Sequence, residues 1–391
     1  MWKGETQMTK ILFISNISKR VGSFSMASIE AAKKCEIEFY YASNWNASTV
    51  EQRQEDERKF EIKLIHVNLD RSPYSPKNIK AYMELVEFVK REKIDFIHCN
   101  TPVGGLLGRI VGKRCKIKRV VYQVHGFQFY NGAPKKNWFL YYPIEKWLSK
   151  KTDALITINK EDFERAKKLK LRNNGDVYYV PGVGIKTELY SQDANKIDKR
   201  KELEIAQDDF VIIAVGRLEK NKNCPTLIEA VAKLKESNIK LVFCGDGPDR
   251  EELTNLAKKL EIGERVLFLG NRSDMSELYQ IADCLALASF REGLSRTIME
   301  AMASGLPCVV SNIRGNVDLI DEKGGFLCNP QDYKGFSDAF SILYNNPDLR
   351  LEMKEHNKQK VQEFSFEKVV AEMEKIYRKE FCVVKENDSE N

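Results

Sequence analysis

One stretch of the chain reads Cys284-Leu-Ala-Leu-Ala-Ser-Phe-Arg-Glu-Gly-Leu-Ser-Arg-Thr-Ile-Met-Glu-Ala-Met-Ala-Ser-Gly305. It begins with a short apolar run, which is typical of a buried strand. The residues that follow predict a helix that opens after Glu292 and runs to about Ser304, and Gly305 suits the end of that helix. The stretch therefore predicts a strand, a loop and a helix in succession.

The same succession recurs along the whole chain. Short β-branched or aromatic runs alternate with longer amphipathic segments such as residues 77–91 and 160–169. The runs that we predict to be strands are 11–15, 37–42, 62–67, 96–99, 120–124, 154–158, 177–180, 210–215, 240–244, 266–269, 284–288, 307–310 and 326–328. Strands that alternate with helices indicate βαβ units, in which helices cover both faces of a parallel sheet. The chain is therefore predicted to be an α/β protein of doubly wound units.

A change of composition near the middle divides the chain. Residues 181–198 begin with Pro181-Gly-Val-Gly184 and continue as a polar segment, which we interpret as an interdomain linker. A length of 391 residues also favours two domains. The predicted parts are two Rossmann-like domains, a final helix with an apolar stripe that needs a covering surface, and two flexible tails. Their limits are 8–182 and 183–364 for the domains, 365–385 for the helix, and 1–7 and 386–391 for the tails.

The composition argues against several classes of protein. A net charge of +6 is small for this length and does not predict nucleic-acid binding. No apolar run approaches the roughly 18–20 residues that span a bilayer, and the polar N-terminus offers no export signal. The nine cysteines form no Cys-x-x-Cys pair, and the four histidines show no metal-ligand spacing. We therefore expect a cytoplasmic protein with reduced thiols and no bound metal.

Two glutamates belong to the stretch quoted above: Glu292 stands just before the predicted helix, and Glu300 lies about two turns along it. Because a helix start leaves backbone N–H groups free, those of Gly293, Leu294 and Ser295 could bind an anion. Glu292 would reach a ligand held there, and Glu300 could accept hydrogen bonds from a ribose diol. Taken alone, the two glutamates are better explained as ordinary charges of a helix start and a solvent face. When the residues of the neighbouring loops are considered as well, ligand binding by the two glutamates becomes the favoured explanation.

A second loop carries basic residues after the strand predicted at residues 210–215. Gly216 would allow a tight turn, and Arg217 and Lys222 would lie at the carboxyl end of the strand, where doubly wound sheets bind their ligands. An arginine fork and a lysine charge can together hold a diphosphate and stabilise negative charge on a leaving group. A solvated basic loop explains these residues equally well when they are taken alone.

A third candidate is His125, which directly follows the strand predicted at residues 120–124 and would face the second domain across a cleft. A structural histidine with satisfied hydrogen bonds is the more common role of a single histidine.

Two motifs are absent from the sequence, and both absences are informative. There is no Asp-x-Asp motif to bind a divalent cation, so basic side chains and helix dipoles would hold the diphosphate. The segment Gly245-Asp-Gly247 lacks the third glycine of a dinucleotide fingerprint, because Arg250 stands there, which argues against hydride transfer.

Together these motifs resemble the family-4 retaining glycosyltransferases, which have the GT-B fold. Residues 292–300 resemble the E-x7-E motif of that family. Val215-Gly-Arg-Leu with Lys222 is similar to its diphosphate-binding loop, and residues 243–248 and 266–270 resemble strand ends nearby. The resemblance covers nearly the whole chain. It implies GT-B architecture, with two Rossmann-like domains facing across a cleft and a final helix that returns to the first domain.

The resemblance also implies roles for the candidates. Glu292 would contact the donor sugar and Glu300 the ribose. Arg217 and Lys222 would hold the diphosphate, and His125 would approach the transferred sugar. Further donor-binding candidates lie on adjoining loops, namely Gly22, Gly216, Gly270, Asn271, Gly293, Leu294 and Ser295. Many relatives carry paired glycines after the first strand, whereas the corresponding loop here has only Gly22.

The segment from His125 to Trp147 resembles bacterial enzymes that build capsular, exopolysaccharide or O-antigen units on a polyprenyl-diphosphate carrier. It interleaves lysines with aromatic residues, a mixture that suits the surface of an anionic membrane. The candidates for acceptor or membrane contact are Phe129, Tyr130, Lys135, Lys136 and Trp138. An aromatic helix packed in the core, with its lysines solvated, would explain the segment equally well.

These inferences predict a retaining glycosyltransferase that moves a hexose or N-acetylhexosamine from a UDP-sugar, with a GDP-sugar as the second choice. The expected acceptor is a polyprenyl-diphosphate-linked glycan. The expected location is the cytoplasm, with peripheral contact at the cytoplasmic face of the inner membrane. The nucleotide sugar is a co-substrate, and neither a cofactor nor a metal is expected. Two alternatives stay open: a sugar-nucleotide epimerase with the same fold, and a non-catalytic binding or scaffold protein.

Overall fold

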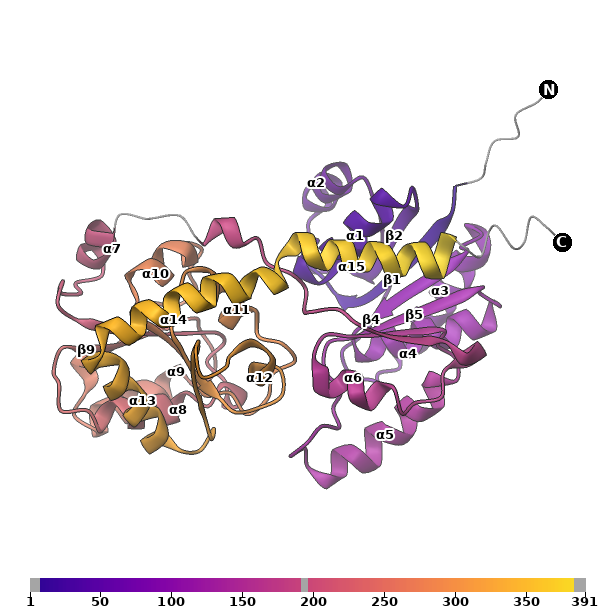
Figure 1. Cartoon of the computed structure of the whole chain (residues 1–391). Helices are drawn as coiled ribbons and strands as arrows, with labels where there is room; N and C mark the ends of the chain where they lie inside the picture. The colour runs from indigo at the N-terminus through magenta and orange to yellow at the C-terminus, as the bar shows by residue number, and fades with distance from the viewer. Residues whose placement is uncertain (1–7, 191–195, 383–391) are drawn as a thin grey trace. The chain divides into compact units, whose positions relative to one another are not determined.

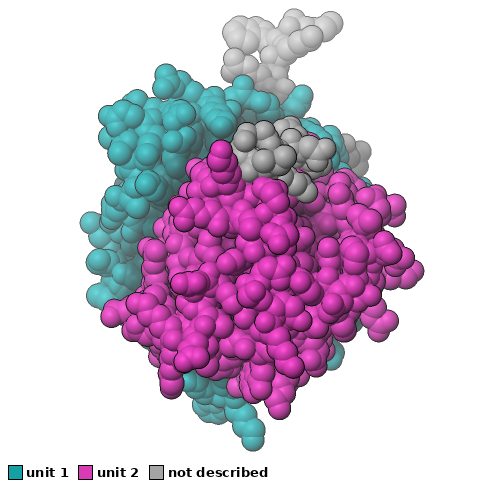
Figure 2. Space-filling model, turned by 90° about the vertical axis from the view of Figure 1, so that its left-hand side faces the viewer, with its two compact units in different colours: residues 1–184, 366–391 teal, residues 185–365 magenta. Residues whose placement is uncertain are grey.

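The structure is a computed structural model that describes residues 8–190 and 196–382. It divides the chain into two compact units, which Figure 1 shows as ribbons and Figure 2 as teal and magenta surfaces. Among the described residues, unit 1 comprises 8–184 and 366–382, and unit 2 comprises 185–190 and 196–365. The predicted tails, 1–7 and 386–391, lie outside the described residues.

Unit 1 is built on a parallel sheet of seven strands in the order β3-β2-β1-β4-β5-β6-β7. The order of the strands changes direction between β1 and β4, as in a doubly wound sheet. The strands are β1 (Lys10–Ile17), β2 (Glu38–Asn44), β3 (Lys63–His66), β4 (Phe96–Asn100), β5 (Arg119–Val124), β6 (Ala154–Thr157) and β7 (Asp176–Tyr179). In the register of the central strands, Ile11 of β1 lies beside Phe39 of β2 and Phe96 of β4.

Helices cover both faces of this sheet. They are α1 (Ser23–Lys34), α2 (Val50–Phe60), α3 (Lys77–Arg91), α4 (Pro102–Arg114), α5 (Lys135–Ser149), α6 (Lys160–Ala166) and α15 (Phe366–Tyr377). Successive strand residues point to opposite faces. Leu12 and Ile14 therefore pack in the cluster with α3 and α4, whereas Ile11 and Phe13 pack in the cluster with α1 and α15.

The last helix, α15, belongs to unit 1 although it lies at the end of the sequence. Its apolar stripe, which includes Val369, Met373 and Tyr377, is buried in the same cluster as residues of α1. Figure 1 shows the two helices next to each other. A π-helical turn over Arg378–Cys382 follows α15. The expectation that a final helix returns to the first domain is therefore confirmed.

Unit 2 contains a parallel sheet of six strands in the order β10-β9-β8-β11-β12-β13. The strands are β8 (Phe210–Val215), β9 (Ile239–Cys244), β10 (Val266–Phe268), β11 (Cys284–Leu287), β12 (Cys308–Ser311) and β13 (Gly325–Cys328). The order changes direction between β8 and β11, so the loops after these two strands open to either side of the switch point. In doubly wound sheets this is where ligands bind.

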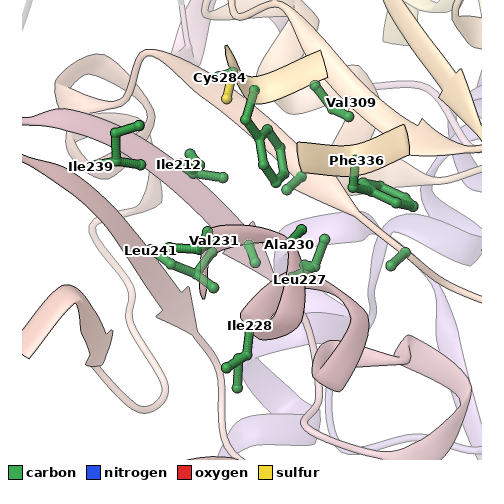
Figure 3. Close-up of a cluster of buried hydrophobic side chains, with 14 of the residues drawn as sticks. Ile212, Leu227, Ile228, Ala230, Val231, Ile239, Leu241, Cys284, Val309 and Phe336 are labelled. Atoms are coloured by element: carbon green, nitrogen blue, oxygen red, sulfur yellow. The ribbon is translucent and has the colours of Figure 1, made fainter. Parts of the chain in front are cut away.

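The helices of unit 2 also lie on both faces of its sheet. They are α7 (Lys196–Glu202), α8 (Cys224–Ala232), α9 (Arg250–Lys259), α10 (Met275–Ile281), α11 (Arg296–Ala303), α12 (Asn316–Leu319), α13 (Tyr333–Asn345) and α14 (Pro347–Lys360). On one face, Ile212 and Leu241 of the sheet pack with Leu227 of α8 and Phe336 of α13 (Figure 3). The opposite face packs against α10 and α11.

All thirteen predicted strands are present, and the predicted fold class is confirmed. The predictions differ from the structure mainly at element ends: α6 stops at Ala166, three residues before the predicted limit. The linker expected at residues 181–198 is shorter than predicted, because α7 already begins at Lys196. Residues 191–195 of that linker lie outside the described residues. The unit boundaries follow Gly184 and Ser365, where the sequence placed them after residues 182 and 364.

Candidate active site

Three loops meet at the carboxyl edge of the unit 2 sheet. The N–H of Gly216, after β8, donates to the carbonyl of Cys244 at the end of β9, with an N–O distance of 3.0 Å. The N–H of Gly245 donates to the carbonyl of Gly270, after β10, at 2.7 Å. Hydrogen bonds between backbone groups therefore fix these loops to one another.

Two of these loops approach so closely that glycine is required. A Cβ atom added to Gly245 would lie 2.0 Å from the carbonyl oxygen of Gly216, and the φ angle of Gly245 is +143°. Gly216 has a φ of +144°, and an added Cβ would lie 3.1 Å from Cε of Lys222. Side chains rarely adopt such φ values. The glycines therefore allow the backbone to pass directly beneath the Lys222 side chain.

Lys222 is paired with Glu292. Lys222 ends a short 3-10 turn, η3 (Lys220–Lys222), and its Nζ lies 2.8 Å from Oε1 of Glu292. Both side chains are mostly buried, with exposed fractions of 20% and 15%. The loops after β8 and β11 thus bring a cation and a carboxylate together at the switch point of the sheet.

Two asparagines that the sequence analysis did not single out hold these loops together. Asn221 donates from Nδ2 to the carbonyl of Arg291 at 3.1 Å, and its backbone carbonyl accepts from the N–H of Phe290 at 2.9 Å. Asn223 donates from Nδ2 to the carbonyl of Ala288 at 3.2 Å. From the sequence, Asn223 could have been found only by its position directly before the next helix, whose first turn is marked by a proline. These bonds fix the position of Lys222 relative to Glu292.

The helix that carries Glu300 begins later than expected. α11 starts at Arg296, and Ser295 is its N-cap, with a side-chain oxygen that accepts from the N–H of Ile298 at 3.4 Å. The prediction that the helix opens directly after Glu292 is therefore wrong, because the Ser295 hydroxyl satisfies a first-turn donor at this point. Gly293 and Leu294 belong to the loop before the helix, not to its first turn.

Glu300 is largely buried and accepts three side-chain donors. Tyr190 donates to Oε1 at 2.9 Å, Tyr279 donates to Oε2 at 3.1 Å, and Nε of Arg296 lies 2.7 Å from Oε1. Glu300 has an exposed fraction of only 8%, so it is not an ordinary charge on a solvent face. Neither tyrosine was found from the sequence, because nothing local to Tyr190 or Tyr279 points to residue 300.

The remaining unit 2 candidates lie on the same loops but are not all in contact. Arg217 is exposed and its Nε lies 3.3 Å from Oε2 of Glu219, so it pairs there and not with Glu292. Gly270 is part of the backbone contact with Gly245, and Asn271 is exposed directly after it. The structure thus brings Lys222 and Glu292 together and leaves Arg217 and Asn271 as solvent-facing neighbours.

In unit 1, His125 follows β5 and packs edge-on against Phe24 of α1, with ring centroids 4.9 Å apart. Its two ring nitrogens are buried and have no hydrogen-bond partner among the described residues. Burial lowers the pKa of His125 to about 4, so the ring is neutral near physiological pH. Gly22 is the N-cap of α1 with an extended backbone, and an added Cβ would meet no atom within 4 Å. The fold therefore does not require glycine at this position.

The aromatic segment is divided between core and surface. Phe129 is 1% exposed and packs against Trp138 and Tyr142, with centroid distances of 5.6 and 5.3 Å. This corrects the expectation that Phe129 contacts an acceptor or a membrane: three aromatic rings bury one another, which removes Phe129 from the surface. Lys135 and Lys136 are exposed at the start of α5.

Within the described part of the chain, no group of three or more His, Cys, Asp or Glu side chains could hold a metal ion. No helix in residues 8–190 or 196–382 is long and apolar enough to cross a membrane.

The two doubly wound units, together with the family models that match the chain, define the class of protein: it is a glycosyltransferase with the GT-B fold. Residues 195–360 match the family described as glycosyl transferases group 1. Residues 25–159 match the family described as glycosyl transferase 4-like.

Similar proteins assign the chain to this family. A Bacillus subtilis (strain 168) protein assigned as the glycosyltransferase EpsD is 36% identical over 376 residues, which cover 94% of this chain and 96% of that protein. The Escherichia coli UDP-Gal:alpha-D-GlcNAc-diphosphoundecaprenol alpha-1,3-galactosyltransferase is 32% identical, covering 77% and 79% of the two chains. The chain belongs to the group 1 glycosyltransferases.

Solved structures show the same fold. The crystal structure of Anabaena HepE in complex with UDP and glucose has a TM-score of 0.77 at 21% identity and covers 95% of this chain and 99% of that one. WaaG, a glycosyltransferase involved in lipopolysaccharide biosynthesis, has a TM-score of 0.71 at 17% identity and covers 94% and 99% of the two chains.

Proposed function

We propose that this glycosyltransferase transfers a hexose or N-acetylhexosamine, with retention of configuration, from a UDP-sugar to a polyprenyl-diphosphate-linked glycan. The observation that carries the donor part is the constellation of Lys222, Glu292 and Glu300 at the switch point of the unit 2 sheet. The name of the Escherichia coli relative, which includes a UDP-sugar and a lipid diphosphate, supports both the donor and the acceptor. The HepE complexes support UDP as the nucleotide.

In the proposed reaction the bond between the anomeric carbon and the diphosphate oxygen breaks, and a bond to the acceptor oxygen forms on the same face of the sugar. The proton of the acceptor hydroxyl goes to the departing diphosphate. Lys222, which already lies beside Glu292, stabilises the charge that develops on that leaving group, and the solvent-facing Arg217 adds a second cation.

The remaining groups orient the donor. Glu292 accepts hydrogen bonds from hydroxyls of the transferred sugar, and Glu300 accepts hydrogen bonds from the two hydroxyls of the ribose. Gly293, Leu294 and Ser295 contribute backbone N–H groups next to Glu292. His125 is neutral, so it contacts the transferred sugar as a hydrogen-bonding group and not as a charge. We propose that the diphosphate is held without a divalent metal, since Lys222 and Arg217 supply the positive charge.

The acceptor also bears on where the enzyme works. A polyprenyl chain stays in the bilayer, so an enzyme that uses a lipid-linked acceptor must work at the membrane surface. We therefore propose peripheral contact with the cytoplasmic face of the inner membrane. The lysines at the start of α5 support this location, because anionic lipids attract basic residues at the surface.

A thermal-shift panel tests the donor site. UDP, GDP and a set of UDP-sugars are added to the wild type, to Glu300→Ala and to Glu352→Ala, an exposed glutamate of α14 that serves as a control. A ligand at a hundred times its dissociation constant stabilises the folded state by about 2.7 kcal/mol. We expect UDP or one UDP-sugar to stabilise the wild type and the control in EDTA, and Glu300→Ala to lose most of that shift.

The alternatives predict different outcomes. A scaffold protein would show no shift with any nucleotide, which would overturn the proposal. An epimerase would bind the nucleotide but would convert the UDP-sugar into its epimer without any acceptor and without net release of UDP. Incubation with a lipid-linked glycan and the stabilising UDP-sugar separates this case, since a transferase releases UDP and extends the lipid-linked product.

A further inference from the structure

Unpaired polar atoms inside unit 1 gather at one place. Among the described residues, thirteen buried side-chain nitrogen or oxygen atoms have no hydrogen-bond partner. Six of these atoms belong to four residues in or directly after two neighbouring strands, β4 and β5, namely His98, Asn100, Gln123 and His125. Since folded proteins satisfy nearly all of their buried polar groups, such a concentration needs an explanation. We call these four residues the polar cluster.

The four side chains share the face of the sheet that α1 and α15 cover. Nδ1 of His98 lies 2.7 Å from the hydroxyl oxygen of Tyr377 in α15. Asn100 lies two residues further along β4, so its side chain points to the same face. The register of the sheet places Asn100 beside Gln123 of β5, and His125 follows Gln123 by two residues. The polar cluster is therefore continuous across the two strands.

The polar cluster is more deeply buried at one end than at the other. His125 is half-buried and packs edge-on against the ring of Phe24, which lies in the first turn of α1. Gln123 is 4% exposed, and Asn100 and His98 are completely buried. Phe24 is itself 58% exposed, so its ring can turn away without opening the core. A ligand would therefore enter beside His125 once Phe24 has moved.

The backbone next to the polar cluster is strained. Thr101 directly follows Asn100 and has a φ of +63° and a ψ of +158°, a conformation that is almost confined to glycine. Its hydroxyl caps α4 by accepting from the N–H of Gly104 at 3.3 Å. Capping alone does not require this strain, since Ser295 caps α11 with an ordinary φ of −76°. Strained backbone of this kind is concentrated at binding and active sites, so it supports a ligand site here.

The polar cluster carries no charge. Burial lowers the pKa of His125 to about 4 and that of His98 to about 3, so both rings are neutral near pH 7. In the part of unit 1 that the structure describes, no Asp, Glu, Lys or Arg side chain shifts the pKa of either ring. A charged group would lose its hydration here and find no opposite charge. Hydroxyl groups, in contrast, would find both donors and acceptors in the imidazole rings and amides.

We propose that the polar cluster is a subsite for the hydroxyl groups of an uncharged sugar, and that it excludes acidic sugars such as uronic acids. Asn100 and Gln123 determine which sugar enters, because each side-chain amide combines a donor with an acceptor, as hydroxyl groups require. A site built to hydrogen-bond a hydroxyl strongly rejects an analogue that lacks it. The inference rests on the proposed function, which supplies two sugars, the transferred sugar and the terminal sugar of the acceptor. It goes beyond that function by restricting the charge of the sugar and naming the residues that select it.

Thermal unfolding of the full chain is the first test. Asn100→Leu replaces the amide by an apolar side chain of similar size. We expect a melting temperature equal to or above that of the wild type, because the amide makes no hydrogen bond to a described residue. Asn357→Leu is the matched control: Asn357 is equally buried, but its Nδ2 donates to the carbonyls of Leu306 and Gly324, both at 2.8 Å. This control should melt at a lower temperature. A lower melting temperature for Asn100→Leu as well would mean that the amide serves the fold, and would overturn the inference.

Saturation-transfer NMR is the second test, with the methyl glycosides of glucose, galactose, N-acetylglucosamine and glucuronic acid as probes. We expect the wild type to bind at least one of the uncharged glycosides and not the glucuronide. Asn100→Leu and Gln123→Met should each weaken this binding about tenfold, because the hydrogen bonds to the sugar are lost. Phe24→Ala should keep it, since Phe24 only covers the polar cluster, and Asn357→Leu should bind like the wild type.

The UDP-sugar that stabilises the wild type separates the two sources of the sugar. It displaces the glycoside, and UDP alone does not, if the subsite holds the transferred sugar. Neither displaces the glycoside if the subsite holds the acceptor sugar. Asn100→Leu should keep the thermal shift with UDP, so the nucleotide panel tests the proposed function separately from this inference.

Three results of the NMR experiment would overturn the inference. The wild type would bind none of the glycosides, or would bind the glucuronide equally well. Asn100→Leu and Gln123→Met would bind as tightly as the wild type. Phe24→Ala would lose as much binding as Asn100→Leu, in which case the glycoside stacks on the exposed ring and does not enter the polar cluster.

Discussion

Nζ of Lys222 lies 2.8 Å from Oε1 of Glu292, although 70 residues separate them in the chain. The pair stands at the switch point between β8 and β11, where two loops leave the sheet in different directions. In this arrangement the lysine is positioned by a carboxylate before any ligand arrives. Its ammonium group keeps two further N–H donors, which a diphosphate can use.

The first prediction concerns this lysine. We expect Lys222→Ala to lower kcat/KM for sugar transfer by about 10²–10³-fold, since it removes a donor that stabilises charge on the leaving group. Lys220→Ala serves as the control, because Lys220 lies in the same turn but is exposed. Steady-state kinetics of UDP release measure both variants. A Lys222→Ala enzyme with unchanged kcat/KM would remove the lysine from the mechanism.

The second prediction concerns the three donors to Glu300. A carboxylate has about four acceptor positions, and three of those of Glu300 are filled. A ribose diol donates two hydrogen bonds, so one of the three present donors must leave before the diol can bind. Arg296 is the candidate, because its side chain is 53% exposed, whereas Tyr279 is fully buried. We expect Tyr279→Phe to weaken UDP binding by about 5–10-fold and Arg296→Met not to weaken it.

Titration calorimetry with UDP measures these affinities. Tyr344→Phe is the control, since it loses one hydrogen bond, to Asn238, away from the site. Equal losses for Tyr279→Phe and Tyr344→Phe would mean that the effect on UDP is general and not a matter of positioning Glu300. A large loss for Arg296→Met would mean that the guanidinium itself contacts the nucleotide.

The third prediction concerns the crossing of two loops at Gly245. Gly245→Ala places a Cβ 2.0 Å from the carbonyl oxygen of Gly216 at a φ of +143°, so one loop must move. We expect a loss of about 2–5 kcal/mol in the free energy of unfolding of unit 2. Gly263→Ala is the matched control, because its Cβ would meet only Lys258 Cγ, at 3.7 Å. Urea unfolding followed by circular dichroism distinguishes them, and equal stability of the two variants would contradict the packing argument.

The fourth prediction concerns the pH dependence of unit 1. Burial lowers the pKa of His98 to about 3 and that of His125 to about 4, from an ordinary value of 6.5. Between about pH 4 and pH 6.5 the unfolded chain therefore binds protons that the folded unit does not. Acidification through this window should lower the free energy of unfolding by up to about 1.4 kcal/mol per pH unit for each histidine.

Tryptophan fluorescence reports on this transition, because Trp45, Trp138 and Trp147 all lie in unit 1. We expect His98→Gln to be less stable at neutral pH, since it loses the bond to Tyr377, but to have a shallower acid slope than the wild type. Above about pH 7 the two should depend on pH in parallel. Identical slopes below pH 6.5 would show that His98 is protonated in the folded unit.

The sequence by itself determined the elements and their class. Thirteen apolar runs appear as thirteen strands, because a strand buried on both faces needs a local run of apolar residues and nothing else. The apolar stripe of the last helix likewise required a surface, and α15 finds it beside α1. The spacing of Glu292 and Glu300 could also be recognised from the sequence, because both residues lie on one continuous loop–helix segment.

Only the tertiary structure decided which side chains meet. Tyr190 and Tyr279 reach Glu300 from 110 and 21 residues away, and no local pattern encodes such a contact. The sequence pattern allowed a helix that begins directly after Glu292. In the structure α11 begins at Arg296, because the Ser295 side chain caps the helix there. On α5, the sequence offered aromatic rings and lysines on every side. Glu145 pairs with the buried Arg109, because a buried carboxylate is stable only beside a cation. This ion pair determines which side of α5, and so which rings, face the core.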